Sequence, residues 1–161
     1  MTGLWSEPCP FAFMTIQPAQ TADVQILDQL LQELMRYERQ WDPNINPEAP
    51  TAGNYAQLLG REDCRLLIAR EGTEILGYLC GFVFASPFHL HPFAALDALY
   101  VRPEARGQGC GRALVEAFCD QARTQGAREV NLKVFSGNGA ARHFYESLGF
   151  GDQARYLRLS L

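Results

Sequence analysis

The sequence predicts a single α/β domain with a mixed, mostly antiparallel sheet of six to seven strands and about four flanking helices. Two observations predict this class. Short runs rich in strand-forming residues lie between segments whose apolar residues recur every three or four positions. The length of 161 residues and the hydrophobic content of 47% are typical of one globular domain, and residues 1–10 are expected to be flexible.

The first third of the chain predicts one strand and two helices. Residues 11–17 are rich in strand-forming side chains and end before Pro18, which predicts a strand. Between 24 and 40, apolar side chains recur at spacings of three and four, which predicts a helix with one apolar face. Residues 42–50 contain three prolines and two asparagines and are expected to form a loop. Residues 51–60 are expected to form a short second helix.

The middle of the chain predicts three strands. Residues 64–70 and 75–85 are rich in apolar strand formers and flank a turn that contains Gly72, which predicts an antiparallel hairpin. A third strand is predicted over 93–101 and ends before Pro103.

The last third alternates between helix and strand. Residues 112–125 carry apolar side chains four apart and end before Gly126, as a helix does. Residues 129–135 alternate between apolar and other side chains and predict a strand, 140–148 predict a helix, and 156–161 predict a final strand. The predicted order is β-α-α-β-β-β-α-β-α-β.

Charge is distributed unevenly along the chain. Residues 1–101 hold 12 acidic and 5 basic side chains, a net charge of −7, and residues 102–161 hold 6 and 9, a net charge of +3, which together give the overall −4. A general nucleic-acid binder needs a basic face, and the acidic half argues against that class. The two halves leave room for two ligands of opposite charge.

The sequence favours a soluble, cytoplasmic protein without a metal. Its first ten residues lack the basic and apolar regions of a secretory signal, and the longest apolar stretch, 75–85, is too short to span a bilayer. Five cysteines without C-x-x-C spacing favour free thiols in a reducing compartment. His89 and His91 have no third ligand nearby, which favours a loop at the mouth of a substrate site over a metal site.

A glycine cluster joins the strand at 93–101 directly to the following helix. Gly107, Gly109 and Gly111 alternate with other residues and lie between Arg106 and Arg112. Glycines let the backbone approach a ligand closely, and the N–H groups at a helix start together with two arginines suit a pyrophosphate. Arg-Ala follows the last glycine where a Walker A loop has Lys-Ser or Lys-Thr, and a dinucleotide fingerprint would need glycine at 112. The competing interpretation is a turn without a ligand.

These residues resemble the GNAT superfamily of N-acetyltransferases, most nearly its diamine and polyamine branch. Residues 106–111 match the pyrophosphate signature Q/R-x-x-G-x-G/A of that family. A second segment matches its N-x-x-A-x-x-F/L-Y-x-x-x-G-F pattern through Asn138, Ala141, Phe144, Tyr145, Gly149 and Phe150. The resemblance is strongest over 96–150 and implies the GNAT fold, with a strand pair that is splayed apart at the acyl-CoA cleft.

The resemblance implies acetyl-CoA as the co-substrate. The glycine loop and the helix after it would hold the pyrophosphate, and main-chain groups at the end of the preceding strand would meet the pantetheine arm. The implied cofactor-binding residues are Leu99, Tyr100, Val101, Arg106, Gly107, Gln108, Gly109, Cys110, Gly111, Arg112, Asn138, Ala141 and Tyr145. Dimers are common in the family, so a homodimer is compatible with the resemblance, although no interface is specified.

Two residues are candidates for acid and base catalysis. Tyr145 matches the family position that faces the thioester sulfur, and a tyrosine is protonated at neutral pH and can act as an acid. Asp97 lies where the polyamine branch has glutamate, and it is the candidate base, acting through water because aspartate is shorter. A two-residue period places Asp97 on the same strand face as Leu99 and Val101. The competing interpretations are an aromatic packing residue and a solvated acid.

The acceptor is expected to be a small cationic amine, such as a polyamine, an amino-acid-like amine or an aminoglycoside. Residues 30–38 resemble the first helix of diamine and polyamine acetyltransferases. The segment that lines the acceptor side in that family carries four acids here, Glu33, Glu38, Asp42 and Glu48. Trp41 could stack on a cationic group. The candidate substrate residues are Glu33, Tyr37, Glu38 and Trp41.

Two alternatives remain at this point. One is a protein or peptide N-acetyltransferase, which needs an open groove in place of a closed pocket. The other is an acyl-CoA-binding module that regulates a partner without catalysis. The carboxylate at 97 and the tyrosine at 145 favour catalysis.

Overall fold

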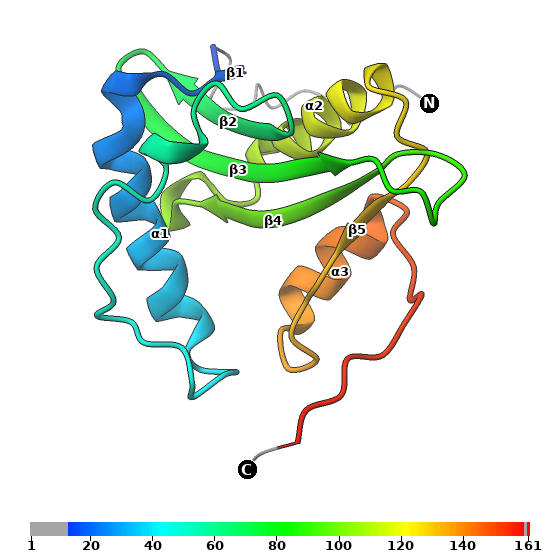
Figure 1. The fold of residues 1–161 in the computed structure, drawn as a ribbon. Coiled ribbons are helices and arrows are strands. Elements are labelled where there is room, and N and C mark those ends of the chain that lie inside the picture. Colours follow the sequence, from blue (N-terminus) through cyan, green and yellow to red (C-terminus); the bar gives the residue numbers. More distant parts are fainter. Residues whose placement is uncertain (1–12, 160) are drawn as a thin grey trace, which may run out of the picture.

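A mixed five-stranded sheet forms the centre of the fold in the computed structural model, which describes residues 13–159 and 161 (Figure 1). The N-terminal segment 1–10, predicted to be flexible, and Cys9 lie outside the described residues. Within the described part there are five strands and three α-helices, and none of these helices is long and apolar enough to span a membrane. The elements are β1 (Thr15–Pro18), α1 (Val24–Glu38), β2 (Cys64–Glu71), β3 (Glu74–Phe84), β4 (Phe93–Val101), α2 (Cys110–Thr124), β5 (Val130–Leu132) and α3 (Gly139–Ser147).

The predicted numbers of six to seven strands and about four helices are wrong, because two of the predicted elements do not form. The final strand over 156–161 does not form: the described residues from 150 to 159 contain no strand (Figure 1). A strand needs a hydrogen-bonded neighbour, and side chains hold this segment instead. Arg158 donates two hydrogen bonds to Asp42, at 2.8 and 2.6 Å, and the ammonium of Lys133 lies 4.8 Å from the centre of the Tyr156 ring.

The second predicted helix, 51–60, is reduced to the 3₁₀ turn Ala56–Leu58. Gly53 and Gly60 have φ angles of +78° and +75°, which no α-helix contains. The carboxylate of the buried Asp28 accepts hydrogen bonds from the backbone N–H groups of Gly53, at 2.6 Å, and Tyr55, at 3.2 Å. Those N–H groups are therefore bonded to α1 instead of to a local helix.

Replacing Asp28 with alanine is expected to lower the free energy of unfolding by about 3 kcal/mol, because two backbone donors lose a charged acceptor. Urea unfolding followed by circular dichroism measures the change. The matched control is Asp152→Ala, since the side chain of Asp152 is 94% exposed and its loss should change stability by less than about 0.5 kcal/mol. Equal stability of the two variants would contradict the anchoring role of Asp28.

The strands lie in the order β1-β2-β3-β4-β5, antiparallel except for the parallel pair of β4 and β5. Pairing between β4 and β5 covers only Ala94–Leu96 on β4, although that strand continues to Val101. The sheet is thus open between the second half of β4 and the chain that follows β5. The end of this pairing at Leu96 agrees with the splayed strand pair that the resemblance implies.

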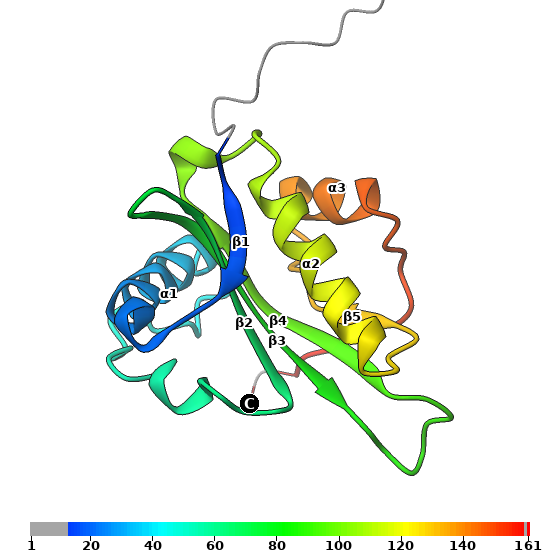
Figure 2. The ribbon, with the colours of Figure 1, turned by 90° about the horizontal axis from the view of Figure 1, so that it is seen from above.

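Helices cover both faces of the sheet, with α1 on one side and α2 and α3 on the other (Figure 2). The α1 face is packed with Leu27, Leu30 and Leu34 against Tyr78 and Tyr100. The core on the opposite face is built around α2: Leu67, Leu76, Leu79, Leu96, Leu114, Val115 and Phe118. The apolar sides of the helices, predicted from the spacing in the sequence, therefore pack against the sheet.

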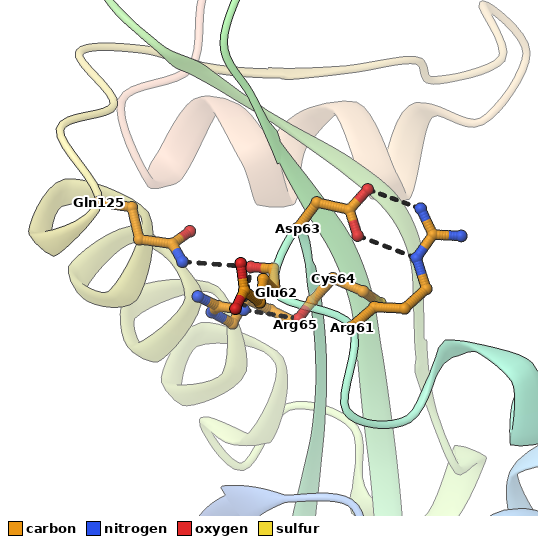
Figure 3. Close-up of polar contacts among 6 residues, drawn as sticks. All are labelled: Arg61, Glu62, Asp63, Cys64, Arg65 and Gln125. Carbon is orange, nitrogen blue, oxygen red and sulfur yellow. Dashed lines mark hydrogen bonds and ion pairs between the residues drawn. The ribbon is translucent and has the colours of Figure 1, made fainter.

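The turn that leads into β2 is tied to the C-terminal end of α2. Gln125 donates a hydrogen bond to the carbonyl of Glu62, and Arg65 donates to the same carbonyl at 3.0 Å (Figure 3). Arg61 forms two hydrogen bonds with Asp63, at 2.9 and 2.6 Å. These bonds fix the end of the sheet remote from the glycine cluster.

Candidate active site

The glycine cluster forms the N-terminus of α2. Gly107 and Gly109 have φ angles of +74° and +84°, and Gly109 is the N-cap of the helix, which begins at Cys110, two residues earlier than predicted. The first N–H groups of a helix have no acceptor within it, and here they lie at an exposed loop with a positive dipole end. At Gly111 a Cβ atom would lie 3.2 Å from Cζ of Phe144, so the glycine permits close approach of α3. The loop fits a pyrophosphate.

The two arginines that flank the glycines differ in their surroundings. Arg112 is exposed and lies 3.6 Å from Glu116, one helical turn along α2. Arg106 donates from Nε to the carbonyl of Val101, at 2.9 Å, and its guanidinium lies 5.2 and 5.5 Å from the ring centres of Tyr37 and Tyr100. Arg106 therefore connects the glycine loop to α1.

The remaining loop residues have local roles. Nε2 of Gln108 donates to the carbonyl of Glu104 at 2.8 Å. Cys110 is buried, and burial raises the pKa of its thiol to about 11, so the side chain is a protonated filler and not a nucleophile at neutral pH. The other described cysteines are Cys64, Cys80 and Cys119, and all have free thiols.

A bulge at Asp97 lies where the sheet opens. Cys80 pairs with Ala98 and Gly81 with Leu96, so Asp97 is the extra residue on β4. Leu96 faces the α2 core, whereas Ala98 and Tyr100 face α1. The bulge has shifted the alternation of side chains by one residue.

The predicted face of Asp97 is wrong for this reason. Leu99 and Val101 pack on the α2 side, whereas the charge of the exposed Asp97 raises the pKa values of Glu38, Tyr78 and Cys80, all of which belong to the α1 side. The carboxylate therefore lies on the face that α1 covers.

Tyr145 lies on α3 and is half-buried against the core on the α2 side of the sheet. Its ring packs edge-on against Phe144 at 5.1 Å and Phe150 at 5.6 Å. Burial, and to a smaller extent the charge of Glu38, raises the pKa of Tyr145 to about 12. Its hydroxyl therefore stays protonated at neutral pH and is able to donate a proton.

Side chains at the end of α1 connect it with β4 and with the segment before α3. The hydroxyl of Tyr100 donates to Glu33 at 2.9 Å, and burial followed by this bond raises the pKa of Tyr100 to about 12. Trp41 packs against Tyr37, with ring centres 5.0 Å apart, and against Phe135, at 6.4 Å. At Gly137 a Cβ atom would lie only 2.6 Å from Trp41. The four candidate substrate residues are thus in one region.

Not every acid of the predicted acceptor segment is available for a cation. Asp42 is paired with Arg158, which holds its pKa at about 2, and Glu48 lies 3.4 Å from Arg36. Glu33, Glu38 and Asp97 form no ion pair within the part of the chain that the structure describes. These three acids remain for a cationic ligand.

Asn138 has a structural role that the sequence motif does not reveal. It is the buried N-cap of α3, and its Oδ1 accepts a hydrogen bond from the N–H of Ala141 at 3.0 Å. Asn138 and Ala141, both predicted to contact the cofactor, are therefore hydrogen-bonded to each other. Helix capping accounts for the three-residue spacing between them in the motif.

The two histidines lie away from the acidic face. They are in the loop between β3 and β4, at the end of the hairpin remote from α1 (Figure 1), and the ring of His89 packs against Phe93 at 4.7 Å. The loop that carries them is therefore not part of the acidic face, and its place at the mouth of a substrate site stays a prediction. In the described residues no group of three or more metal-ligating side chains is found.

The opened sheet, the glycine-rich helix start and the acid-lined face together fit an enzyme that transfers an acyl group from a coenzyme A thioester. Residues 27–150 match the model of the Acetyltransferase (GNAT) family, and the chain belongs to this family. It is thus an acetyltransferase of the family that uses acetyl-CoA.

Similar proteins act on several acceptors. The uncharacterized N-acetyltransferase YhfO of Bacillus subtilis is 27% identical over 148 residues, which are 92% of this chain and 97% of that protein. The thialysine N-epsilon-acetyltransferase of Bos taurus is 28% identical over 147 residues, 88% of this chain and 86% of that protein. The structure of an aminoglycoside acetyltransferase from an uncultured soil metagenomic sample, in complex with sisomicin, has a TM-score of 0.74 at 20% identity and covers 93% of this chain and 97% of its own.

Proposed function

We propose that the protein transfers an acetyl group from acetyl-CoA directly to a primary amine of a small cationic acceptor. The observation that carries this proposal is the set of three acids without a cation, Glu33, Glu38 and Asp97, on the α1 side of the opened sheet. Thialysine and aminoglycosides, named for two similar proteins, are amines, which supports the same class.

The glycine loop is the proposed site for the pyrophosphate of acetyl-CoA. The backbone N–H groups from Gly107 to Arg112 and the exposed guanidinium of Arg112 would hold it there. Main-chain groups of Leu99–Val101, which have no partner on β5, would meet the pantetheine arm. When bound, the thioester supplies an activated acetyl group.

The acceptor must lose a proton before it can act as a nucleophile. An alkylamine with a pKa of about 10.4 is neutral about once in 2,500 molecules at pH 7, which corresponds to about 4.6 kcal/mol. Asp97, at the bulge, is the proposed base and acts through a water molecule. Tyr145, on α3, is the proposed acid that protonates the leaving sulfur.

A thiol-release assay with acetyl-CoA and a panel of amines tests this function. Polyamines, aminoglycosides, amino-acid-like amines and a lysine-containing peptide are compared at equal concentration. Turnover of at least one small cationic amine is the expected result. Turnover of the peptide alone would indicate a protein acetyltransferase. Binding of CoA without any turnover would indicate a regulatory module.

Replacing Asp97 with asparagine is expected to lower kcat/KM about 30-fold at pH 6 and less than about 3-fold at pH 10. The loss is largest at low pH because the acceptor there is nearly all ammonium and needs a base. The pH profile of kcat/KM measures this change. A profile with the same shape as that of the wild type would exclude Asp97 as the base.

A further inference from the structure

An ion pair holds the chain after α3 to the end of α1. Residues 152–159, which we call the C-terminal strap, contain no helix or strand (Figure 1). Arg158 of the strap donates from both of its Nη atoms to the carboxylate of Asp42, at 2.8 and 2.6 Å. The side chain of Asp42 is only 10% exposed, whereas that of Arg158 is 45% exposed. A two-pronged, charge-assisted contact fixes direction as well as distance, so the strap has a defined place beside α1.

Asp42 is a rigid anchor for the strap. Its Oδ1 also accepts a hydrogen bond from the N–H of Asn44, at 3.0 Å. Its own N–H donates to the carbonyl of Glu38, the last residue of α1, at 3.3 Å. The carboxylate is therefore held in place by the end of the helix and by the loop that follows. Loss of Arg158 would leave a nearly buried charge without a cation, which is unfavourable, so we expect the pair to stay closed.

The strap connects the two sides of the opening in the sheet. Lys133 follows β5 directly, and its ammonium lies 4.8 Å from the ring centre of Tyr156, a contact that uses the ring and not the hydroxyl. At the other end of the strap, the ion pair reaches the end of α1. This helix covers the open half of β4, where Tyr100 donates to Glu33 of α1 at 2.9 Å. The strap therefore crosses from the chain after β5 to the helix that packs on β4.

A second bridge lies beside the ion pair. The ring of Trp41 stacks on Phe135, which belongs to the chain after β5, with ring centres 6.4 Å apart and 20° between the ring planes. Trp41 is a candidate substrate residue and immediately precedes Asp42. Two adjacent residues after α1 are thus connected to the chain beyond β5, one by its own ring and the other through the strap.

We propose that the pair of Arg158 and Asp42 restricts the acceptor to small amines by keeping the C-terminal strap across this end of the opening. This selectivity rests on the proposed function and adds to it a residue pair that determines specificity. The lysine of a peptide carries backbone in two directions, and that backbone needs an open groove, whereas a free small amine does not. A peptide could enter only if the strap moved away, and a nearly buried carboxylate would then lose its guanidinium.

The test measures the ratio of kcat/KM for a lysine-containing peptide to kcat/KM for the best small amine of the panel. In Arg158→Gln and in Asp42→Asn this ratio is expected to rise about 10-fold or more over that of the wild type, while kcat for the small amine stays within about 3-fold. Asp42→Asn keeps a side-chain oxygen for the N–H of Asn44 and removes the charge that holds the strap.

The matched control is Arg61→Gln. Arg61 forms the same two-pronged contact with Asp63, at 2.9 and 2.6 Å, and its side chain is 49% exposed, but this pair lies just before β2 and away from the opening (Figure 3). Its ratio should equal that of the wild type. An unchanged ratio in both strap variants would overturn the proposal. A rise of the same size in Arg61→Gln would also overturn it, because loss of any such ion pair would then have the same effect.

Limited proteolysis follows the strap without any substrate. Trypsin cleaves after arginine, and Arg155 lies within the strap. Cleavage after Arg155 is expected to be about 10-fold faster in Arg158→Gln and Asp42→Asn than in the wild type or Arg61→Gln, because proteolysis follows the population in which the segment is released. Equal rates would overturn the proposal, since the pair would not hold the strap.

The two readouts separate this role from the proposed function. Faster cleavage with an unchanged ratio would show that the strap is released but does not select the acceptor, and the proposed function would stand without this role. If the wild type acetylates no small amine, the proposed function itself fails, and the selectivity that rests on it fails too.

Discussion

Replacing Tyr145 with phenylalanine is expected to lower kcat between about 10² and 10³-fold while the Kd of acetyl-CoA changes less than about 2-fold. The phenolic hydroxyl is the part of the side chain that can protonate sulfur, whereas its ring packs against Phe144 and Phe150 and is kept in the variant. The pKa of about 12 means that the acid stays protonated throughout the usual assay range, so the loss should not depend on pH below about pH 10. Steady-state kinetics and calorimetric titration with acetyl-CoA measure the two quantities.

The matched control is Tyr156→Phe, which removes the same hydroxyl from a ring that is 74% exposed and lies outside the site. Its kcat should equal that of the wild type. Full activity of the Tyr145 variant would exclude the hydroxyl as the acid. An equal loss of kcat in both variants would point to a general effect of the substitution and not to proton transfer.

Local patterns account for most of the elements. The spacing of Leu27, Leu30 and Leu34 predicts α1, and the glycine turn at 72 predicts the hairpin of β2 and β3, because both signals involve residues close in sequence. The final strand failed because its fate depended on distant partners. Arg158 binds Asp42, 116 residues away, and no local pattern contains that contact.

The site shows the same division between local and distant causes. The glycine loop could be predicted because a tight approach to a helix N-terminus requires glycine within a few residues. The sheet face on which Asp97 lies could not be predicted, because it depends on a bulge that only the pairing of β4 with β3 reveals.

Replacing Gly107 and Gly109 together with alanine is expected to raise the Kd of CoA between about 30 and 1,000-fold. Both glycines have positive φ angles, +74° and +84°, and a Cβ atom at either position would meet no atom within 4 Å, so the effect is conformational and not a clash. A left-handed conformation costs an L-residue about 1–2 kcal/mol, and two such residues give about 2–4 kcal/mol. The free loop would relax to avoid this cost, and binding would have to restore it, which corresponds to that change in Kd.

The matched control for the loop is the double variant Gly60→Ala and Gly72→Ala. These glycines have φ angles of +75° and +56° and equally open surroundings, but they lie in turns outside the CoA loop. Alanine there should lower the free energy of unfolding by a similar amount and leave the Kd of CoA unchanged, because no ligand depends on those turns. If both double variants bound CoA as tightly as the wild type, the left-handed loop would not be the pyrophosphate site. If both bound CoA weakly, a loss of fold stability would explain the effect. A loss confined to the Gly107 and Gly109 variant therefore distinguishes backbone geometry at the start of α2 from stability of the fold.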